Sequence, residues 1–153
     1  MKLFRLSRAK YGKVLSGKGA SSAGARWNTQ GTEIIYTADS RSLAMAEVAV
    51  HFGIGTMPLD YMMMTLEVPD AASLIEIQIK DLPPDWNRWP PLLATQQIGD
   101  GFIRNNEVCL LKVPSAVTQG DFNYLINPSH PEFSGIKIGG YERFPFDKRL
   151  FKT

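Results

Sequence analysis

The chain has 153 residues, of which 44% are hydrophobic and 21% are charged, and its formal net charge is +2. This length suits one domain with a core of its own, and the weak, scattered positive charge argues against a nucleic-acid-binding protein. The single cysteine, Cys109, excludes an internal disulfide and a zinc site made of several cysteines. The short, charged N-terminus and the lack of a long apolar run predict a soluble cytoplasmic protein with no signal peptide and no membrane span.

Hydrophobic alternation and β-branched or aromatic runs predict strands at 2–6, 33–37, 60–68, 75–80, 107–113 and 122–126, with shorter β-like pieces at 136–138 and 144–146. Two helices are expected, one over 41–52 ended by Gly53 and Gly55, the other over 92–98 ended by Gly99 and Gly101. The glycines of 10–20 and the prolines of 82–91 predict loops. This order indicates a strand-dominated α+β fold in a single domain over 1–153.

An arginine, a tryptophan and an asparagine stand side by side after the glycine-rich loop at 10–20. Gly24 permits a positive φ and a close approach of the backbone to another group. Arg26 then offers a planar fork of donors that suits a phosphate or a carboxylate. The alternative is that Arg26 is an ordinary surface arginine and Trp27 a core anchor.

The helix predicted at 41–52 is apolar on nearly every side, so we expect it to be buried. Glu47 lies four residues after Leu43 and three before Val50, which puts its carboxylate on the same face as both. A carboxylate inside an apolar helix is costly unless a partner satisfies it. Glu47 therefore either pairs with an arginine for architecture alone or belongs to a functional site, whereas His51 is expected only at the helix end.

Two further polar positions belong to predicted strands. Tyr36 shares a face with Ile34 if Ile35 faces the core. Ser115 directly follows a largely apolar strand, so its side chain can reach a cleft at the end of that strand, although serines there commonly only cap a turn.

The chain contains no G-x-G-x-x-G fingerprint, no Walker A loop, no histidine and cysteine metal spacing, and no G-x-S-x-G elbow. The common nucleotide folds are therefore disfavoured, and no metal is required. An arginine can hold a diphosphate, a tyrosine can stack on an aromatic ring, and a carboxylate can stabilise an oxocarbenium-like centre. Arg26, Tyr36 and Glu47 together suit cleavage of an N-glycosidic bond in a dinucleotide.

Short motifs run along the chain in a specific order, at Leu15–Gly19, Gly24–Asn28, Ile34–Ala38, Leu43–Val48, Val113–Val117, Asn123–His130 and Phe146–Leu150. Through them the sequence resembles the RES domain, the toxin half of bacterial RES–Xre toxin–antitoxin pairs. That family is named after an arginine, a glutamate and a serine, and the matching positions are Arg26, Glu47 and Ser115; Tyr36 matches a further tyrosine. Ala25 departs from the pattern, in which a second glycine is common.

The resemblance implies a fold like that of the diphtheria-toxin-type ADP-ribosyltransferases, with NAD⁺ as the substrate and no cofactor required. It implies NAD⁺ depletion by hydrolysis or phosphorolysis, or transfer of ADP-ribose to a protein. It also implies an Xre-like antitoxin that covers the site, a toxin homodimer within the complex, and DNA contact only through the antitoxin.

The resemblance also implies a role for each matching side chain. Arg26 binds the diphosphate or ribose side of NAD⁺, and Tyr36 packs against the nicotinamide or its ribose. Glu47 stabilises the positive charge that develops at the anomeric carbon. Ser115 hydrogen-bonds the substrate or positions Arg26 or Glu47. Two further side chains are expected near the substrate, namely Asn28 and Asn127.

Two other functions remain open from the residues alone. A metal-independent ribonuclease would use Glu47 and His51 as acid and base, with Arg26 on a phosphate. A non-catalytic interaction module would instead present Arg26, Trp27 and the tryptophans of the loop at 82–91.

Overall fold

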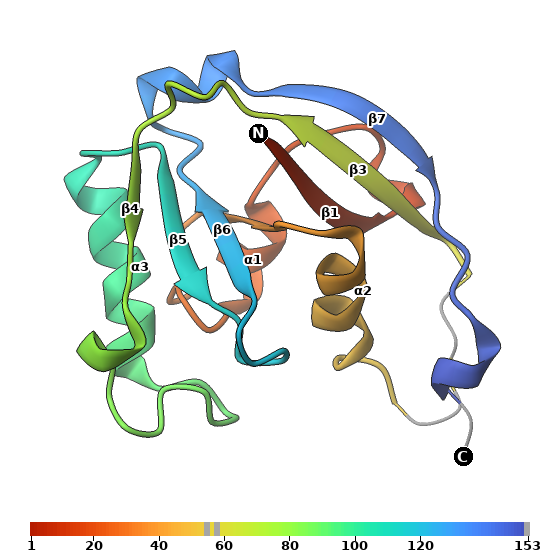
Figure 1. Cartoon of the computed structure of the whole chain (residues 1–153), viewed down its shortest axis with the longest axis horizontal. Helices are drawn as coiled ribbons and strands as arrows, with labels where there is room; N and C mark the ends of the chain where they lie inside the picture. The colour runs from red at the N-terminus through yellow and green to blue at the C-terminus, as the bar shows by residue number, and fades with distance from the viewer. Residues whose placement is uncertain (54–55, 57–58, 152–153) are drawn as a thin grey trace.

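The computed structural model describes residues 1–53, 56 and 59–151, which are built on one mixed sheet (Figure 1). Its strands are β1 (Lys2–Arg8), β2 (Ile35–Ala38), β3 (Tyr61–Glu67), β4 (Leu74–Glu76), β5 (Leu110–Pro114), β6 (Phe122–Ile126) and β7 (Lys137–Arg143). The helices are α1 (Lys18–Ala23), α2 (Arg41–Ala49) and α3 (Leu93–Asn105), and the 3₁₀ turns are η1 (Ala9–Tyr11), η2 (Ile79–Asp81), η3 (Pro131–Gly135) and η4 (Lys148–Phe151). This confirms the predicted strand-dominated α+β class.

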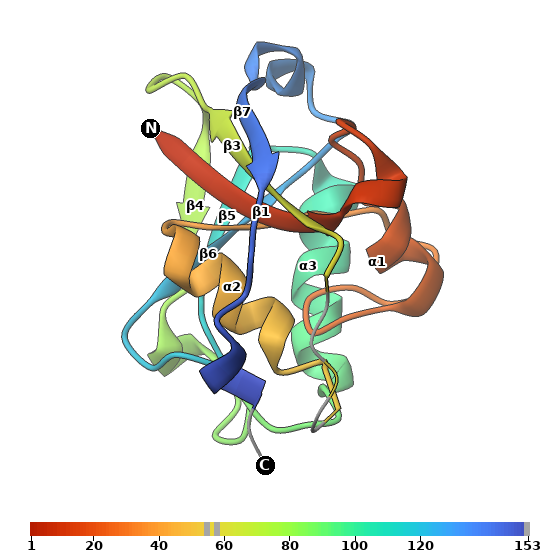
Figure 2. The ribbon, with the colours of Figure 1, turned by 90° about the vertical axis from the view of Figure 1, so that its right-hand side faces the viewer.

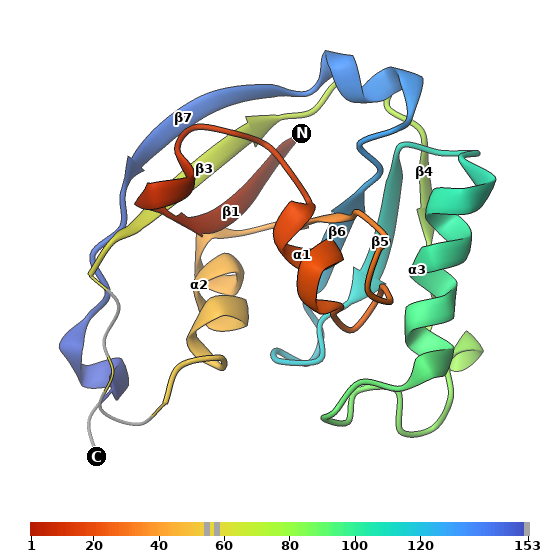
Figure 3. The same cartoon turned by 180° about the vertical axis from the view of Figure 1, so that it is seen from behind.

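The sheet has the strand order β4-β5-β6-β2-β1-β3-β7 and divides into two halves. β1 pairs with β3 along its whole length, but it meets β2 at a single register pair, Phe4 with Ala38. The β1–β3–β7 half therefore swings away from the rest of the sheet, and α2 lies below the place where they separate (Figure 1). Figure 2 shows β7 as the outer strand of this half, and Figure 3 shows α1 and α3 beside β5 and β6 from behind.

Side chains on the two faces of the strands pack in different hydrophobic clusters. Ile35 of β2 packs with side chains of β1, β3 and β5, whereas Ile34 and Tyr36 pack on the other side with Trp27 and with Phe102 of α3. This confirms the predicted alternation in β2. A third cluster joins α2 to β1, β3 and the segment that follows β7.

The predicted end of the second helix is wrong, because α3 continues through Gly99 and Gly101 to Asn105. A Cβ atom added to Gly99 would lie 1.6 Å from the carbonyl oxygen of Trp27. Glycine at this position therefore lets the helix pack directly on the backbone and does not end it. The helix ends instead at Asn106, whose positive φ of 52° forms the C-terminal cap.

Four of the predicted strands also need correction. The alternating run at 75–80 forms only the short edge strand β4, because this strand pairs with β5 alone and the chain then turns into η2. The pieces predicted at 136–138 and 144–146 are replaced by one strand, β7, whose register shifts once against β3. The strand predicted to start at residue 107 starts at Leu110.

The N-terminal helices differ from the prediction as well. The loop predicted at 10–20 is partly helical, because η1 and α1 take its two ends. α2 ends earlier than predicted, at Ala49, and Gly55, one of the glycines expected to end it, lies outside the described residues. Nor is the helix buried all round: Val50 at its C-cap is 57% exposed, because α2 packs through one face and turns another toward a cavity.

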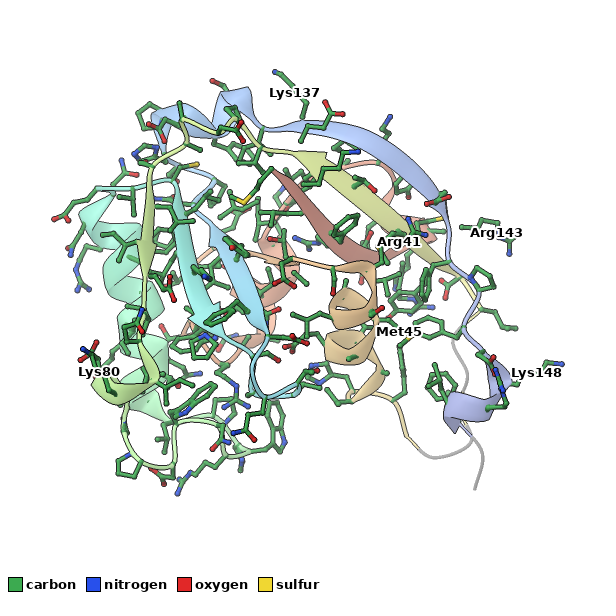
Figure 4. All side chains as sticks on the ribbon, viewed as in Figure 1. Arg41, Met45, Lys80, Lys137, Arg143 and Lys148 are labelled. Atoms are coloured by element: carbon green, nitrogen blue, oxygen red, sulfur yellow. The ribbon has the colours of Figure 1, made fainter. Side chains whose placement is uncertain are left out.

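Basic side chains lie at separate places on the outside of the molecule. Lys80 in η2, Lys137 and Arg143 at the two ends of β7, and Lys148 in η4 all point outward (Figure 4). This agrees with a net charge of only +2 that is spread along the sequence. None of the described helices is both long enough and apolar enough to span a lipid bilayer.

Replacing Gly99 with alanine should destabilise the fold. The added methyl group would collide with the backbone of Trp27, a residue that is only 2% exposed, and overpacking of this kind costs about 1–3 kcal/mol or more. Gly101→Ala is the matched control in the same helix, because its Cβ would meet only the Arg104 side chain, at 3.7 Å. There alanine should stabilise the helix by about 0.5–1 kcal/mol. Thermal unfolding measures both, and equal stability of Gly99→Ala and wild type would contradict this packing.

Candidate functional site

A cavity of about 520 Å³ lies where the two halves of the sheet separate. β1 contributes Phe4 and Arg5 to its wall, β2 contributes Tyr36, and α2 contributes Glu47. Arg26 closes another side. The structure therefore brings together, in one cavity, three of the side chains that the sequence pointed to: the arginine, the tyrosine and the glutamate.

Two neutral donors hold the carboxylate of Glu47. Ser115 Oγ donates to Glu47 Oε1 at 2.7 Å, and Asn123 Nδ2 donates to the same oxygen. Ser115 Oγ itself accepts from the backbone N–H groups of Val117, at 3.1 Å, and Thr118, at 3.0 Å, so its only proton points to Glu47. Ser115 is thus placed to orient the carboxylate. The partners of Glu47 are not the arginine that the architectural alternative requires.

Arg26 connects the cavity to the proline-rich loop at 82–91. Its Nη1 donates to the backbone oxygens of Trp86 and Arg88, each at 2.9 Å. Burial lowers the pKa of the guanidinium, and the negative charge of Glu47 opposes this by raising it. A guanidinium keeps its charge under such conditions, so Arg26 and Glu47 place opposite charges in the same cavity.

The tryptophans divide into core and rim. Trp27 and Trp86 are 2% and 7% exposed, and their ring centroids lie 6.1 Å apart. Trp27 is therefore a core anchor, as one of the two interpretations predicted. Trp89 is 69% exposed and lines the cavity beside His51, whose ring it meets edge-on with centroids 5.9 Å apart.

The hydroxyl group of Tyr36 is fully used within the protein. It donates to Asn28 Oδ1 at 2.7 Å and accepts from the backbone N–H of Trp27 at 3.1 Å. Burial raises the pKa of Tyr36 well above its ordinary value, so the residue stays neutral and offers the cavity its ring. Asn28 is fully buried behind this wall and does not line the cavity. Its Nδ2 donates to the backbone oxygens of Ala20, Thr29 and Thr32.

The structure does not bring Asn127 to this cavity. Because β5 and β6 are antiparallel, Asn127 follows β6 at the end of the sheet opposite to Ser115. Its Nδ2 donates to Asn106 Oδ1 at 2.8 Å, and its Oδ1 accepts from the backbone N–H of Ser129 at 2.9 Å. This side chain ties two connecting segments together, which corrects the expectation that it contacts the substrate.

The sequence interpretation missed three polar residues that line the cavity, Arg5, Thr37 and Asn123. Arg5 Nη1 is buried without a hydrogen-bond partner among the described residues, and burial lowers the pKa of its guanidinium. A buried cation without a partner is costly unless an anion meets it. The sequence held one signal for Arg5, because this residue follows the apolar Leu3 by two positions and so shares its face of the predicted strand. The signal for Asn123 was its place at the start of the motif Asn123–His130, one of those that carry the family resemblance.

A family profile described as RES domain matches residues 2–147. The chain belongs to the RES domain family. This confirms the resemblance carried by the motifs around Arg26, Glu47 and Ser115. The Prs ADP-ribosylating toxin of Sphingobium sp. (strain YBL2) is 36% identical to this RES domain over 140 residues, which cover 90% of this chain and 87% of that protein. Toxin Res of Photorhabdus laumondii subsp. laumondii is 36% identical over 156 residues, covering 100% of this chain and 99% of that protein.

A solved structure has the same fold. The crystal structure of the M. tuberculosis MbcT–MbcA toxin–antitoxin complex contains a chain that superposes on this RES domain with a TM-score of 0.74 at 20% sequence identity. The match covers 98% of this chain and 86% of that one. At this level of identity the similarity shows a shared fold.

Removing the hydroxyl group of Tyr36 should make the RES domain less stable. Tyr36→Phe leaves Asn28 Oδ1 and the N–H of Trp27 buried and without this partner, which costs about 1–3 kcal/mol. Tyr11→Phe is the control: Tyr11 is 64% exposed, so the free energy of unfolding should change by less than about 0.5 kcal/mol. Denaturant titration at neutral pH compares the two.

Tyr36 should also make stability depend on pH in alkaline solution. A tyrosine of the unfolded chain loses its proton near pH ~10, whereas folded Tyr36 keeps it because burial raises its pKa. The folded state therefore binds more protons above about pH 10, and the free energy of unfolding falls as the pH rises. The fall should be shallower in Tyr36→Phe, and equal slopes in the two proteins would contradict this account.

Proposed function

We propose that this RES domain is the toxin of a toxin–antitoxin pair and that it breaks the N-glycosidic bond of NAD⁺. One observation carries the proposal: Glu47, whose carboxylate is oriented by Ser115, lines the same cavity as Arg5 and Arg26. The relative from Sphingobium, which is named an ADP-ribosylating toxin, supports it, because transfer of ADP-ribose begins with breaking this bond.

The chemistry follows from where charge develops. When the bond breaks, nicotinamide leaves as a neutral molecule with the bonding electron pair, and positive charge spreads over the anomeric carbon and the ring oxygen of the ribose. A carboxylate already fixed in place stabilises this charge without reorienting. Hydrogen bonds from Ser115 and Asn123 fix Glu47 in that way. Water, phosphate or a protein side chain then adds to the anomeric carbon, which distinguishes hydrolysis, phosphorolysis and ADP-ribosyl transfer.

The other walls of the cavity suit the remaining parts of the dinucleotide. Arg5 lines the cavity, and its Nη1, which is buried and has no hydrogen-bond partner within the described chain, would gain one if the side chain turned toward a phosphate oxygen there. Arg26 supplies a second cation for the diphosphate. The rings of Tyr36 and Trp89 provide faces against which the nicotinamide or its ribose packs.

A metal-independent ribonuclease is the second candidate, because His51 lines the same cavity as Glu47. In that function His51 and Glu47 exchange protons with the RNA, and NAD⁺ has no part. The non-catalytic interaction module has less support, because Trp86, one of the tryptophans that it would present, is only 7% exposed.

The partner we propose is an Xre-like antitoxin that covers the mouth of the cavity, where Val50 and Trp89 are exposed. The toxin would form a homodimer within that complex and act in the cytoplasm. DNA would be contacted only through the antitoxin, in keeping with a net charge of +2. The M. tuberculosis structure with the same fold, itself a toxin–antitoxin complex, supports such a partner.

Glu47→Gln should abolish NAD⁺ consumption, because an amide cannot stabilise the cationic transition state as a carboxylate does. We expect the rate to fall by about 10²–10³-fold. The measurement is intracellular NAD⁺ after brief induction. Glu107→Gln is the matched control, since Glu107 is exposed on the segment between α3 and β5, and it should deplete NAD⁺ as the wild type does.

The same experiment separates the candidate functions. Constant NAD⁺ in growth-arrested wild-type cells would count against bulk NAD⁺ depletion and would favour the ribonuclease or transfer to a scarce target. If NAD⁺ falls, purified protein incubated with NAD⁺ and then given phosphate or whole lysate identifies the acceptor from the product formed.

Ser115→Ala should lower kcat while leaving KM nearly unchanged. It removes one of the two donors to Glu47 Oε1 without touching the cavity wall. Loss of a hydrogen bond to a charged group corresponds to about 10–100-fold in rate. Ser115→Thr, which keeps a hydroxyl group, is the matched variant and should retain most of the activity. A raised KM with an unchanged kcat would mean that the hydroxyl group contacts the substrate instead of positioning Glu47.

A further inference from the structure

A second cluster of reactive side chains lies at the end of the sheet away from the cavity. Cys109 directly precedes β5, whereas Ser115, at the cavity end, directly follows it. His130 and Glu132 flank the start of η3 and reach the same place. One potential ligand atom from each of Cys109, His130 and Glu132 lies within 4.8 Å of the other two.

The three side chains form a gradient from the core to the surface. Cys109 is fully buried, the side chain of His130 is 10% exposed, and that of Glu132 is 41% exposed. The carboxylate and the imidazole are therefore the parts of the cluster nearest to the solvent, and the sulfur is the innermost. The chain contains one cysteine and two histidines in all, and this cluster uses the cysteine and one of the histidines.

Neighbouring groups already hold the cluster in place. Ser73 donates to Glu132 Oε2 through its backbone N–H, at 2.8 Å, and through its Oγ, at 2.6 Å. The same Oγ accepts from the backbone N–H of Cys109 at 2.9 Å. His130 Nδ1 accepts from the backbone N–H of Glu132 at 3.2 Å and lies 3.9 Å from Glu132 Oε2. Hydrogen bonds of this kind around the ligands orient the side chains of metal sites.

We propose that Cys109, His130 and Glu132 bind one zinc ion, with water as the fourth ligand. Sulfur, imidazole nitrogen and carboxylate oxygen are the donors that zinc takes in proteins, in tetrahedral geometry. With zinc–sulfur and zinc–nitrogen bonds of about 2.3 and 2.0 Å, the ligand atoms stand about 3.5 Å apart. The ligand atoms, now up to 4.8 Å apart, therefore have to approach one another by up to about 1.3 Å.

Zinc binding changes two bonds of the metal-free protein. Cys109 binds as the thiolate, so its proton passes to the solvent. If zinc takes Nδ1 of His130, that lone pair leaves the backbone N–H of Glu132, which it accepts from in the metal-free protein. The ion then joins the start of β5 to η3 and stabilises the fold. This effect arises at the end of the sheet away from the cavity and its proposed chemistry.

Cobalt and zinc titrations of the purified full chain test this site. After treatment with a chelator, Co²⁺ should bind in a one-to-one ratio and give a thiolate-to-metal charge-transfer band together with the visible bands of tetrahedral cobalt. Zn²⁺ should displace it. At about 100-fold excess over the Kd, Zn²⁺ should raise the Tm by about 5–10 °C.

Variants at the surface keep the test independent of folding, because Cys109→Ser alters a core position. His130→Gln and Glu132→Gln should each weaken Co²⁺ binding at least about tenfold, whereas His51→Gln, which removes the other histidine, should leave it unchanged. A wild-type protein without a thiolate band, or an unaltered band in both His130→Gln and Glu132→Gln, would overturn the proposal. Neither the Co²⁺ spectrum nor the Tm depends on NAD⁺ chemistry. A negative result would therefore overturn the zinc site without affecting the proposed function, and the reverse also holds.

Discussion

The cavity depends on one narrow seam in the sheet, the single register pair between Phe4 of β1 and Ala38 of β2. Continuous antiparallel pairing at this place would bring the two strands within hydrogen-bonding distance along their length and leave no space between them. Because the pairing stops after one pair, side chains of both strands face a cavity of about 520 Å³. α2 lies below the seam and adds Glu47, so a local break in the ladder creates the chemical environment of the site.

Residues that do not line the cavity fix the orientation of two side chains that do, Tyr36 and Glu47. Gly99 lets α3 rest on the backbone of Trp27, whose N–H in turn holds the hydroxyl group of Tyr36. On the other wall, two backbone N–H groups of the turn after β5 donate to the Ser115 hydroxyl group, which in turn donates a hydrogen bond to Glu47. Tyr36 and Glu47, which line the cavity, are thus each held by a residue that does not line it, Trp27 and Ser115 respectively, which is how a small domain presents rigid polar groups.

The sequence revealed the polar residues where their chemistry conflicted with their surroundings. Glu47 was visible because it interrupts an apolar helix, and the family motifs added Ser115. Arg5 was harder, because an arginine on a short strand is ordinary until the strand is known to border a cavity. Gly99 was read as a helix end, because only the packing of α3 on another backbone reveals its role. Asn127 belongs to one of the family motifs. Because β5 and β6 are antiparallel, however, it lies at the end of the sheet away from the cavity.

Arg26 presents two edges of one rigid plane. Both hydrogen atoms of Nη1 are directed to carbonyl oxygens of the loop at 82–91, which leaves the Nε and Nη2 edge of the guanidinium for an anion. The rotamer freedom of a long side chain is therefore lost when the loop folds and does not have to be lost again when a ligand arrives. By thermodynamic linkage, an anion bound to Arg26 stabilises the ordered loop by the same free energy by which the ordered loop strengthens anion binding. The loop at 82–91 carries four prolines. How well this loop is ordered therefore contributes to the affinity of Arg26 for an anion.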